Sequence, residues 1–321
     1  MERRKVYIRA DADNKIGYGH FIRCVALADI LKSKYDVILF SQNPSHFQYD
    51  ECEGICRLES LPSDDTKFDI FLSKLHGSEI VVLDNYFFKS EYQKAIKNKG
   101  CSLVVLGSND RHYYADAVIN FTNLLASQFS KEPYTKMCLG LLWSILRKPF
   151  YKSAAIERKS NTFIICIGGT DQFCFAEKFS SIILSHYPQL SIKVISTDRI
   201  GEQRITQFHQ RSISTGINLS ADEMAMAFRS AEYVLVSASG VAIEALSQEA
   251  NVISGYYVPN QQNIYNTLLV EDYIWPLGDF FQPQCTDQLL NAIHSIKDGQ
   301  SKKQFIAHST IDLYTKLFDT L

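Results

Sequence analysis

The chain has 321 residues, of which 46% are hydrophobic and 21% are charged, and its formal net charge is −2. This length exceeds one hydrophobic core, so we expect two domains. The near-neutral charge excludes the basic surface that nucleic-acid binding requires, and we expect no nucleic-acid partner. No apolar run approaches the ~18 residues of a membrane-spanning helix, and the stretch Val6–Ile8 is too short for a signal peptide. We therefore expect a cytoplasmic protein without stable membrane insertion, and the oligomeric state stays open.

Short β-branched segments alternate with amphipathic segments of helical length, as in parallel α/β sheets. The first half contains predicted strands at 5–10, 36–41, 80–84, 102–107, 118–120 and within 134–143, and predicted helices at 20–34 and 89–99. A polar connector is expected at 152–161. The second half contains predicted strands at 162–167, 192–196, 233–237 and 251–255, and predicted helices at 173–187, 221–230, 241–248 and 301–321. The pattern indicates two α/β domains, residues 1–150 and 151–321.

The first candidate site follows the strand 5–10, because ligands of open parallel sheets bind beyond the carboxyl ends of the strands. Gly17 and Gly19 allow the backbone to approach a ligand, and a helix that begins at His20 presents free N–H groups. His20 is placed to exchange a proton with that ligand. Arg23 lies on the same helix face, where it could bind an anion. The competing interpretation, a glycine turn with a capping histidine, stays open.

Two patterns bear on metal binding. Asp11 and Asp13 match the D-x-D pattern of metal sites in many nucleotide-sugar transferases, but that pattern normally ends a middle strand. Cys52 and Cys56 have a spacing that could supply two ligands of a zinc site, but no second Cys/His pair completes it. The eight cysteines are irregularly spaced, which favours buried free thiols in a reducing compartment. We expect no metal and no cofactor.

The second candidate site follows the strand 162–167. This strand runs into Gly168 and Gly169, and Thr170 and Asp171 are candidate helix caps. The arrangement repeats that of the first domain. A binding role and a purely structural role are equally supported.

The third candidate site follows the strand 233–237. Small residues here, including Ser237, Ser239 and Gly240, expose N–H groups that suit a diphosphate. Glu244 is expected in the first turn of the next helix. A carboxylate there either complements the helix dipole or accepts hydrogen bonds from two ribose hydroxyls.

The fourth candidate site follows the strand 251–255. Asn260 and Gln261 suit the hydroxyl and acetamido groups of a sugar, although Asn260 as a helix cap is the alternative. Two further polar segments follow predicted strands: 84–86, which includes Tyr86, and 109–110. We expect both to face the same cleft between the domains.

Taken together, these segments resemble the hydrolases that release UDP from UDP-2,4-diacetamido-2,4,6-trideoxy-β-L-altropyranose in pseudaminic acid biosynthesis, relatives of the glycosyltransferase B superfamily. The similarity runs in order along nearly the whole chain and is most specific over 9–24. Residues 142–150 look like the family's segment that closes the first domain, and 168–171 like the one that opens the second. The resemblance implies two Rossmann-like domains facing across a cleft, a UDP-sugar substrate and no metal.

The resemblance also implies roles for single residues. His20 would be the general base acting on water, and Asp11 and Arg23 would support the sugar end. The turn 237–240 would hold the diphosphate, with Glu244 on the ribose. Asn85 stands where the family usually has histidine, which leaves the sugar open. An inverting glycosyltransferase of the same fold and a non-catalytic nucleotide-sugar binder are the alternatives.

Overall fold

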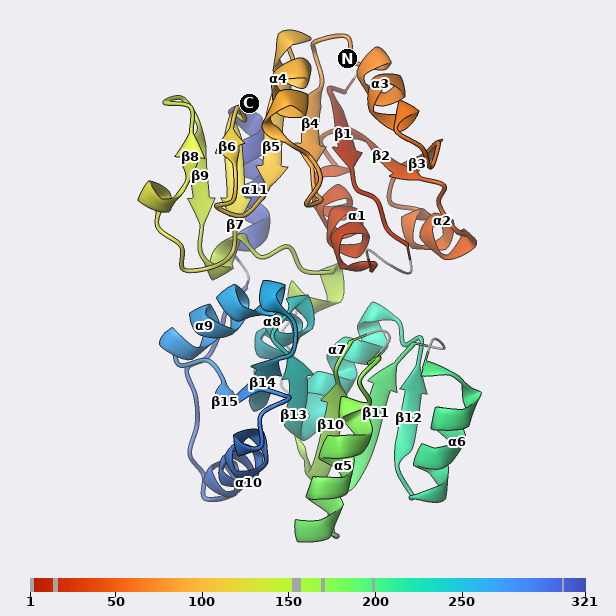
Figure 1. Cartoon of the computed structure of the whole chain (residues 1–321), viewed down its shortest axis with the longest axis vertical. Coiled ribbons are helices and arrows are strands. Elements are labelled where there is room, and N and C mark those ends of the chain that lie inside the picture. Colours follow the sequence, from red (N-terminus) through yellow and green to blue (C-terminus); the bar gives the residue numbers. More distant parts are fainter. Residues whose placement is uncertain (1–2, 14–16, 152–156, 169–170, 198–199, 308) are drawn as a thin grey trace. The chain divides into compact units, whose positions relative to one another are not determined.

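The computed structural model describes residues 3–13, 17–151, 157–168, 171–197, 200–307 and 309–321. The chain forms two compact units, Met1–Lys148 with His308–Leu321, and Pro149–Ala307. Each unit is a parallel sheet with helices packed against it (Figure 1).

The first unit contains a seven-stranded sheet in the order β3-β2-β1-β4-β5-β7-β9, in which every neighbouring pair is parallel. Its strands are β1 Lys5–Arg9, β2 Asp36–Gln42, β3 Arg57–Leu61, β4 Ile80–Leu83, β5 Ser102–Leu106, β7 Ala117–Asn120 and β9 Lys136–Leu139, with β6 His112–Tyr113 and β8 Ser130–Lys131 as a separate pair. Its helices are α1 Gly19–Leu31, α2 His46–Cys52, α3 Thr66–Ser73, α4 Ser90–Asn98 and α11 Thr310–Asp319.

Both faces of this sheet are buried, because successive side chains of a strand point to opposite sides. In β1, Val6 and Ile8 belong to the core cluster that contains residues of α1, whereas Tyr7 belongs to a second cluster with residues of α3 and α4. A strand that is buried on both faces has a nearly continuous apolar sequence. This explains why the central strands were predictable from the sequence.

The second unit contains a six-stranded parallel sheet in the order β12-β11-β10-β13-β14-β15, which is the 3-2-1-4-5-6 order of a doubly wound Rossmann sheet. Its strands are β10 Lys159–Cys166, β11 Ser191–Ser196, β12 Ser214–Ile217, β13 Ala231–Ser237, β14 Val252–Tyr256 and β15 Trp275–Asp279. Its helices are α5 Phe175–His186, α6 Glu202–Gln210, α7 Ala221–Ser230, α8 Gly240–Ser247, α9 Gln262–Val270 and α10 Gln284–Lys297, and a 3-10 turn η5 covers Pro259–Gln261.

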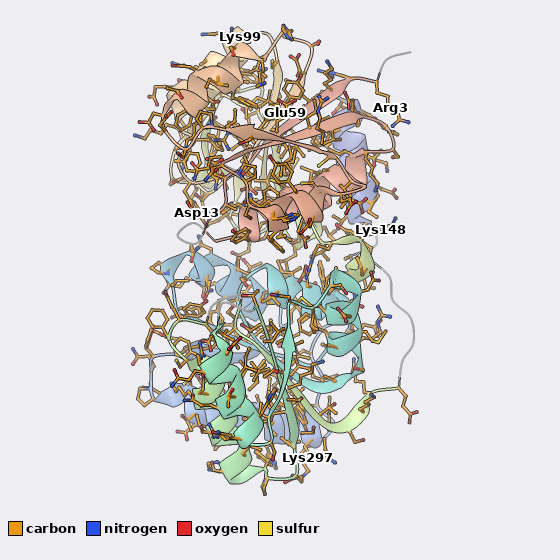
Figure 2. The ribbon with its side chains drawn as sticks, turned by 90° about the vertical axis from the view of Figure 1, so that its right-hand side faces the viewer. Arg3, Asp13, Glu59, Lys99, Lys148 and Lys297 are labelled. Atoms are coloured by element: carbon orange, nitrogen blue, oxygen red, sulfur yellow. The ribbon has the colours of Figure 1, made fainter. Side chains whose placement is uncertain are left out.

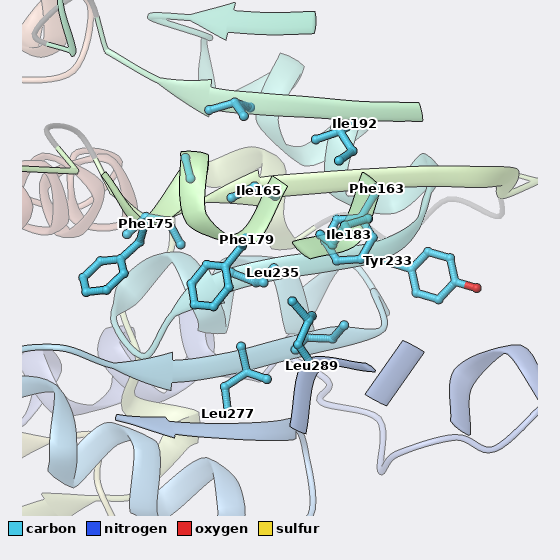
Figure 3. Close-up of a cluster of buried hydrophobic side chains, with 14 of the residues drawn as sticks. Phe163, Ile165, Phe175, Phe179, Ile183, Ile192, Tyr233, Leu235, Leu277 and Leu289 are labelled. Carbon is cyan, nitrogen blue, oxygen red and sulfur yellow. The ribbon is translucent and has the colours of Figure 1, made fainter. Parts of the chain in front are cut away.

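The core of the second unit joins the central strands to the helices on one face of the sheet. Figure 3 shows Phe163 and Ile165 of β10 and Leu235 of β13 beside Phe175 and Phe179 of α5, and all of these side chains are buried. α5 therefore packs on β10, the strand that ends two residues before Gly168.

The expected division of the chain differs from the structure at the C-terminus. The predicted helix 301–321 was assigned to the second domain, but α11 belongs to the first unit. Tyr314, Leu317 and Phe318 lie in the same core cluster as residues of α1, and Figure 1 shows α11, in blue, beside the elements of the first unit. Apolar burial therefore ties this helix to the first sheet. The expected connector 152–161 is also too long, because β10 begins at Lys159.

The predicted fold class, α/β with two Rossmann-like domains, is confirmed. The strands near the centre of each sheet were predicted within a few residues, but β3, β12 and β15 and several helices were not predicted. In the part of the chain that the structure describes, no helix is both long enough and apolar enough to cross a membrane.

Candidate active site

The two sheets each have a point where the order of the strands reverses direction, and ligands of doubly wound sheets bind beyond the carboxyl ends of the strands there. In the first unit this point lies between β1 and β4, which pair directly. In the second unit it lies between β10 and β13. Among the described residues, most of the sequence-predicted ones follow the strands at these two points, whereas Asn260 and Gln261 follow the neighbouring strand β14.

His20 and Asp84 meet at the switch point of the first unit. His20 is in the first turn of α1, and Asp84 directly follows β4. The distance from His20 Nδ1 to Asp84 Oδ1 is 2.7 Å, and the two side chains are 10% and 0% exposed. An ionised carboxylate only accepts hydrogen bonds, so the contact with Asp84 requires a proton on Nδ1, although Arg23 Nη2, which is also a donor, lies 3.0 Å from the same nitrogen. This leaves Nε2 of a neutral His20 as the acceptor, which is the state that a general base requires.

Arg23 is paired with Asp84 rather than held ready for an anion. Its Nε donates to Asp84 Oδ2 and its Nη2 to Oδ1, and the Cys24 thiol donates to Oδ2 at 3.5 Å. Burial by itself would raise the pKa of Asp84, but the charges of Arg23 and His20 and their hydrogen bonds hold it well below its ordinary value. The same pairing raises the pKa of Arg23 although its burial opposes this. Asp84 is therefore ionised at neutral pH, and Arg23 balances its charge.

Aromatic rings border this network. The ring of Tyr86 meets the His20 imidazole edge-on, with 4.7 Å between the centroids, and Tyr86 is 58% exposed. The guanidinium of Arg23 lies 5.7 Å from the centre of the Phe121 ring. Tyr86, predicted as a binding residue, is thus beside His20, whereas Phe121 was not predicted. Both rings offer apolar surface to the C–H groups of a ligand.

Asp11 is buried in an ion cluster and does not face solvent. It is 0% exposed, its Oδ2 accepts from Arg9 Nη2 at 2.8 Å and lies 3.3 Å from Lys67 Nζ, and its Oδ1 accepts from the Gln42 amide N–H at 2.8 Å. Asp13, labelled in Figure 2, lies near the side-chain amide of Gln42, with 3.4 Å between Gln42 Nε2 and Asp13 Oδ2. These contacts fix the backbone after β1. Asp11 therefore fits a positioning role better than direct contact with a sugar.

Asn85 connects this loop to the end of β4. Its Oδ1 accepts from the Asp11 N–H at 2.6 Å, and its Nδ2 donates to the Asp11 carbonyl at 3.2 Å. Asn85 is 7% exposed, so water does not replace these bonds easily. The Asn85 side-chain amide both donates and accepts, and it thereby links the segment after β1 to the segment after β4.

The glycines of the first turn have separate roles. Gly17 has φ +81°, a left-handed conformation that disfavours other residues, and its N–H donates to the Asp13 carbonyl. Gly19 is the first residue of α1, and Tyr18 is its N-cap. His20 thus lies inside the helix and does not cap it. The capping interpretation is wrong, and the ring of His20 is directed to Asp84.

The ends of three strands meet around the carbonyl of Ile167 in the second unit. Ser237 Oγ donates to this carbonyl at 3.2 Å, and Tyr257 Oη donates at 3.3 Å. Gly168, which follows, has φ +118°. Gly169 and Thr170 lie outside the described residues. These bonds place the predicted turns after β10, β13 and β14 at one edge of the sheet.

Asp171 caps the N-terminus of α5. Its Oδ1 accepts from the Phe175 N–H at 2.9 Å and its Oδ2 from the Ala176 N–H at 3.0 Å, and Arg204 Nη2 donates to Oδ2 at 2.9 Å. Burial raises the pKa of Asp171 despite these bonds. The carboxylate thus satisfies the first two N–H groups of α5, as expected of a capping side chain, although the N-cap position itself is Cys174, and its role is structural.

The predicted phosphate turn leads into α8. Ser237 is 1% exposed and binds internally, whereas Ser239 is half-buried and Gly240, the first residue of α8, is exposed. Glu244 lies in the second turn, and the first turn of α8 contains no acidic residue. The expected first-turn position of Glu244 is therefore wrong. Dipole stabilisation fades beyond one turn, which weakens the purely structural interpretation of this carboxylate.

Asn260 and Gln261 differ in exposure. Gln261 is 7% exposed, and its Oε1 accepts from the Tyr257 N–H at 3.1 Å, so it stabilises the loop after β14. Asn260 is exposed inside η5, and the N-cap of α9 is Gln261. The alternative of Asn260 as a helix cap is therefore wrong.

The described residues contain no group of three or more His, Cys, Asp or Glu side chains that could hold a metal ion. At the D-x-D pattern, the carboxylate of Asp11 is already balanced by Arg9 and Lys67. Two cations beside one carboxylate make a poor site for a divalent cation.

Asp84 is the residue that sequence reasoning undervalued. In the sequence it is only one of several polar residues that follow strands, because its partner His20 is 64 positions away. The sequence signal for Asp84 has two parts. An acidic residue directly follows a central apolar strand, and a glycine-rich turn follows the first strand of the same domain.

Comparisons with known proteins bear on the fold and on the relatives of the chain. No family model matches the chain. A curated relative from Campylobacter jejuni, UDP-2,4-diacetamido-2,4,6-trideoxy-β-L-altropyranose hydrolase, is 25% identical over 277 residues, which cover 84% of this chain and 97% of the relative.

Solved structures share the fold at low sequence identity. The pneumococcal O-GlcNAc transferase GtfA, in complex with UDP and GlcNAc, is 10% identical with a TM-score of 0.65 and covers 100% of this chain and 99% of its own. The UDP-GlcNAc 2-epimerase from Methanocaldococcus jannaschii is 12% identical with a TM-score of 0.60, covering 98% and 99%. The chain thus has a fold of the glycosyltransferase B type and resembles the UDP-2,4-diacetamido-2,4,6-trideoxy-β-L-altropyranose hydrolases over most of its length.

Proposed function

We propose that the protein hydrolyses a UDP-linked acetamido sugar at the anomeric C–O bond and releases UDP and the free sugar, a step of nonulosonic (pseudaminic) acid or surface polysaccharide biosynthesis in the cytoplasm. The observation that carries the proposal is the 2.7 Å contact between His20 Nδ1 and Asp84 Oδ1 at the switch point of the first unit. The name of the Campylobacter jejuni relative supports the substrate class.

In the proposed reaction, His20 Nε2 accepts a proton from water while the water oxygen attacks the anomeric carbon. The C–O bond to the diphosphate breaks, and UDP departs with the bonding electrons. Asp84 keeps the proton on Nδ1 throughout and stabilises the imidazolium that forms, as the acid of a catalytic triad does. Arg23 and Asp11 act here as positioning residues, Arg23 through Asp84 and Asp11 through the backbone after β1.

The second unit would bind UDP. In this proposal the N–H groups at the start of α8, next to Ser239 and Gly240, bind the diphosphate, and Glu244 accepts hydrogen bonds from the ribose. Gly168 and Asn260 border the same sheet edge. A helix N-terminus stabilises the negative charge that develops on the leaving group, so the reaction needs no metal. Activity that survives EDTA supports this part, and restoration by Mg²⁺ or Mn²⁺ after loss would contradict it.

The proposal predicts inversion at the anomeric carbon. A retaining mechanism needs a carboxylate that attacks the sugar. The carboxylate nearest to His20 is Asp84, which is 0% exposed and accepts bonds at both oxygens. It is therefore not available as a nucleophile, and water attacks directly.

The decisive experiment is turnover of UDP-2,4-diacetamido-2,4,6-trideoxy-β-L-altropyranose in ¹⁸O-water without any acceptor, with UDP-GlcNAc as the comparison substrate. We expect the label on the anomeric oxygen of the free sugar and none in UDP. Label in a phosphate product would refute attack at carbon.

An inverting glycosyltransferase is the second candidate. The observation that favours it is the shared fold with GtfA, and the same His20–Asp84 pair could deprotonate a hydroxyl of an acceptor. UDP release only after addition of an acceptor would support this function. Binding of the UDP-sugar without any turnover would instead indicate a non-catalytic binder.

A further inference from the structure

A pocket in the first unit lies at the amino-terminal ends of the strands. His20 lies at the other end of the sheet, beyond the carboxyl ends of the strands. The volume of the pocket is about 430 Å³, within the range of small-molecule sites. The residues that line it come from the amino-terminal ends of β2 and β3, the segments before these strands and the segment before β1, and they include Arg3, Lys32, Arg57, Asp36 and Cys56. Three cations and one anion give the lining an excess of positive charge. Nothing in the proposed hydrolysis uses this pocket.

Cys56 has a second thiol as its neighbour. Cys52 is the last residue of α2, and the Cys56 N–H donates to the Cys52 carbonyl at 3.1 Å, which closes one turn of the chain. The two residues are therefore one turn apart, and each thiol shifts the pKa of the other. Cys52 is 2% exposed, whereas Cys56 is half-buried and lines the pocket. Only one of the two sulfurs is therefore open to a ligand.

The pair is chemically asymmetric. The hydrogen bond from Cys52, the Leu39 N–H and the charge of Lys32 lower the pKa of Cys56, against the opposing effects of burial and of Asp29. The same thiol–thiol bond, together with burial, raises the pKa of Cys52. Cys56, which is also the more accessible of the two, thus ionises more readily than Cys52 and is the better nucleophile.

The cations around Cys56 are held in place by other contacts. Arg3, labelled in Figure 2, donates from Nη1 to the Lys32 carbonyl at 3.0 Å, and Lys32 Nζ donates to the Gly54 carbonyl at 3.2 Å. Lys32 also pairs with Asp29 at 2.6 Å, and Arg57 Nε lies 3.5 Å from a carboxylate oxygen of Glu59. The pocket therefore combines a nucleophilic sulfur with fixed positive charge, which suits an anionic ligand.

We propose that Cys56 and Cys52 form a thiol–disulfide exchange site for a low-molecular-weight disulfide that carries carboxylates. The Cys56 thiolate attacks one sulfur of the ligand, the ligand's S–S bond breaks, and one thiolate leaves with the bonding electrons. Cys52 then attacks the Cys56 sulfur, and its proton passes to the second ligand thiolate as that leaves. The ligand is reduced to one thiolate and one thiol, and the protein gains a Cys52–Cys56 disulfide.

The test is to incubate the reduced full-length protein with glutathione disulfide and to follow each cysteine by peptide mass mapping. The exposed Cys174 serves as an internal reference in the same sample. We expect loss of two hydrogens from the peptide with Cys52 and Cys56. We expect the C52S variant to accumulate a mixed disulfide at Cys56 and the C56S variant to leave Cys52 unmodified. Modification of Cys174 with Cys56 untouched would overturn the proposal.

A charge variant tests the role of the pocket. The double substitution Lys32→Gln and Arg57→Gln should slow the reaction of Cys56 with glutathione disulfide about tenfold, because it removes charge that attracts the ligand. Its reaction with cystamine, a cationic disulfide, should not slow, which controls for misfolding. The rate at Cys174 should not change with either reagent. Equal slowing with both disulfides would overturn the assignment of an anionic ligand.

Discussion

Asp84 Oδ1 lies 2.7 Å from His20 Nδ1, so the end of β4 holds the imidazole that the first turn of α1 presents. His20 is on the helix that follows β1, and Asp84 directly follows β4, the strand that pairs with β1. Asp84 also binds Arg23. Any loss of this carboxylate therefore changes both the orientation of His20 and the balance of charge around it.

Replacing Asp84 with Asn should lower turnover of the UDP-sugar by about 10²–10³-fold, because an amide no longer fixes the proton on Nδ1. His20→Gln should cost about 10²–10⁴-fold, and the double variant should be little worse than His20→Gln alone, since both changes remove one function. Steady-state UDP release measures all three. Asp312→Asn, at an exposed residue in the first turn of α11 to which no role is assigned, is the control. If the loss of turnover in the double variant equalled the product of the losses in the two single variants, Asp84 and His20 would act separately.

Asp84 should also make stability depend on acid pH. Its pKa in the folded protein is well below the value of about 3.9 expected for an unfolded chain, so its ionisation stabilises the fold above that value. This contribution is lost as pH falls through the folded pKa. Urea unfolding of the wild type and of Asp84→Asn from pH 7 to pH 3 should show a stability difference that shrinks below about pH 4. The other carboxylates titrate equally in the two proteins, so their effects cancel in the stability difference. A stability difference that does not change with pH would contradict the ionised state of Asp84.

Asn85→Ala should lower the free energy of unfolding by about 1–3 kcal/mol, because it leaves the buried N–H and carbonyl of Asp11 without their partner. Urea unfolding measures this loss. Asn98→Ala, at the exposed end of α4, removes the same side chain without such contacts and should cost much less. Equal effects of the two substitutions would exclude the proposed link between the loops after β1 and β4.

Glu244→Ala should weaken UDP binding by about 1–3 kcal/mol through the loss of charge-assisted hydrogen bonds to the ribose, and turnover at saturating substrate should change much less. Calorimetric titration with UDP measures the affinity. Glu249→Ala, just beyond the end of α8, removes the same charge from an exposed position and should leave UDP affinity unchanged. Unchanged affinity in Glu244→Ala would return this residue to a structural role.

The sequence predicted the central strands because burial on both faces demands apolar residues at every position. The segment Ile80–Leu83 is an example, with all four side chains buried. Edge strands lack this requirement. β12, with the sequence STGI, borders β11 only, and β15 contains Pro276 and Gly278, which an edge tolerates. Neither segment has a pattern that distinguishes it from a loop.

The candidate site was predictable where it depends on one segment and unpredictable where it depends on two. The glycine turn and the helix start that surround His20 are adjacent in sequence. The contact of His20 with Asp84 depends on β4 lying directly beside β1, and local sequence does not fix the order of strands. For the same reason Arg23 was expected to bind an anion, because its partner carboxylate is distant in the chain.

The position of α11 makes the second unit an insertion within the first. The first unit begins before β1 and regains its last core residues, including Tyr314 and Phe318, only after the whole segment Pro149–Ala307. A ribosome therefore completes the second unit while the first still lacks part of its core, although domains more commonly mature from the N-terminus. Removing the final helix should thus damage the unit that carries His20, and a fragment that stops at Lys148 should lose solubility.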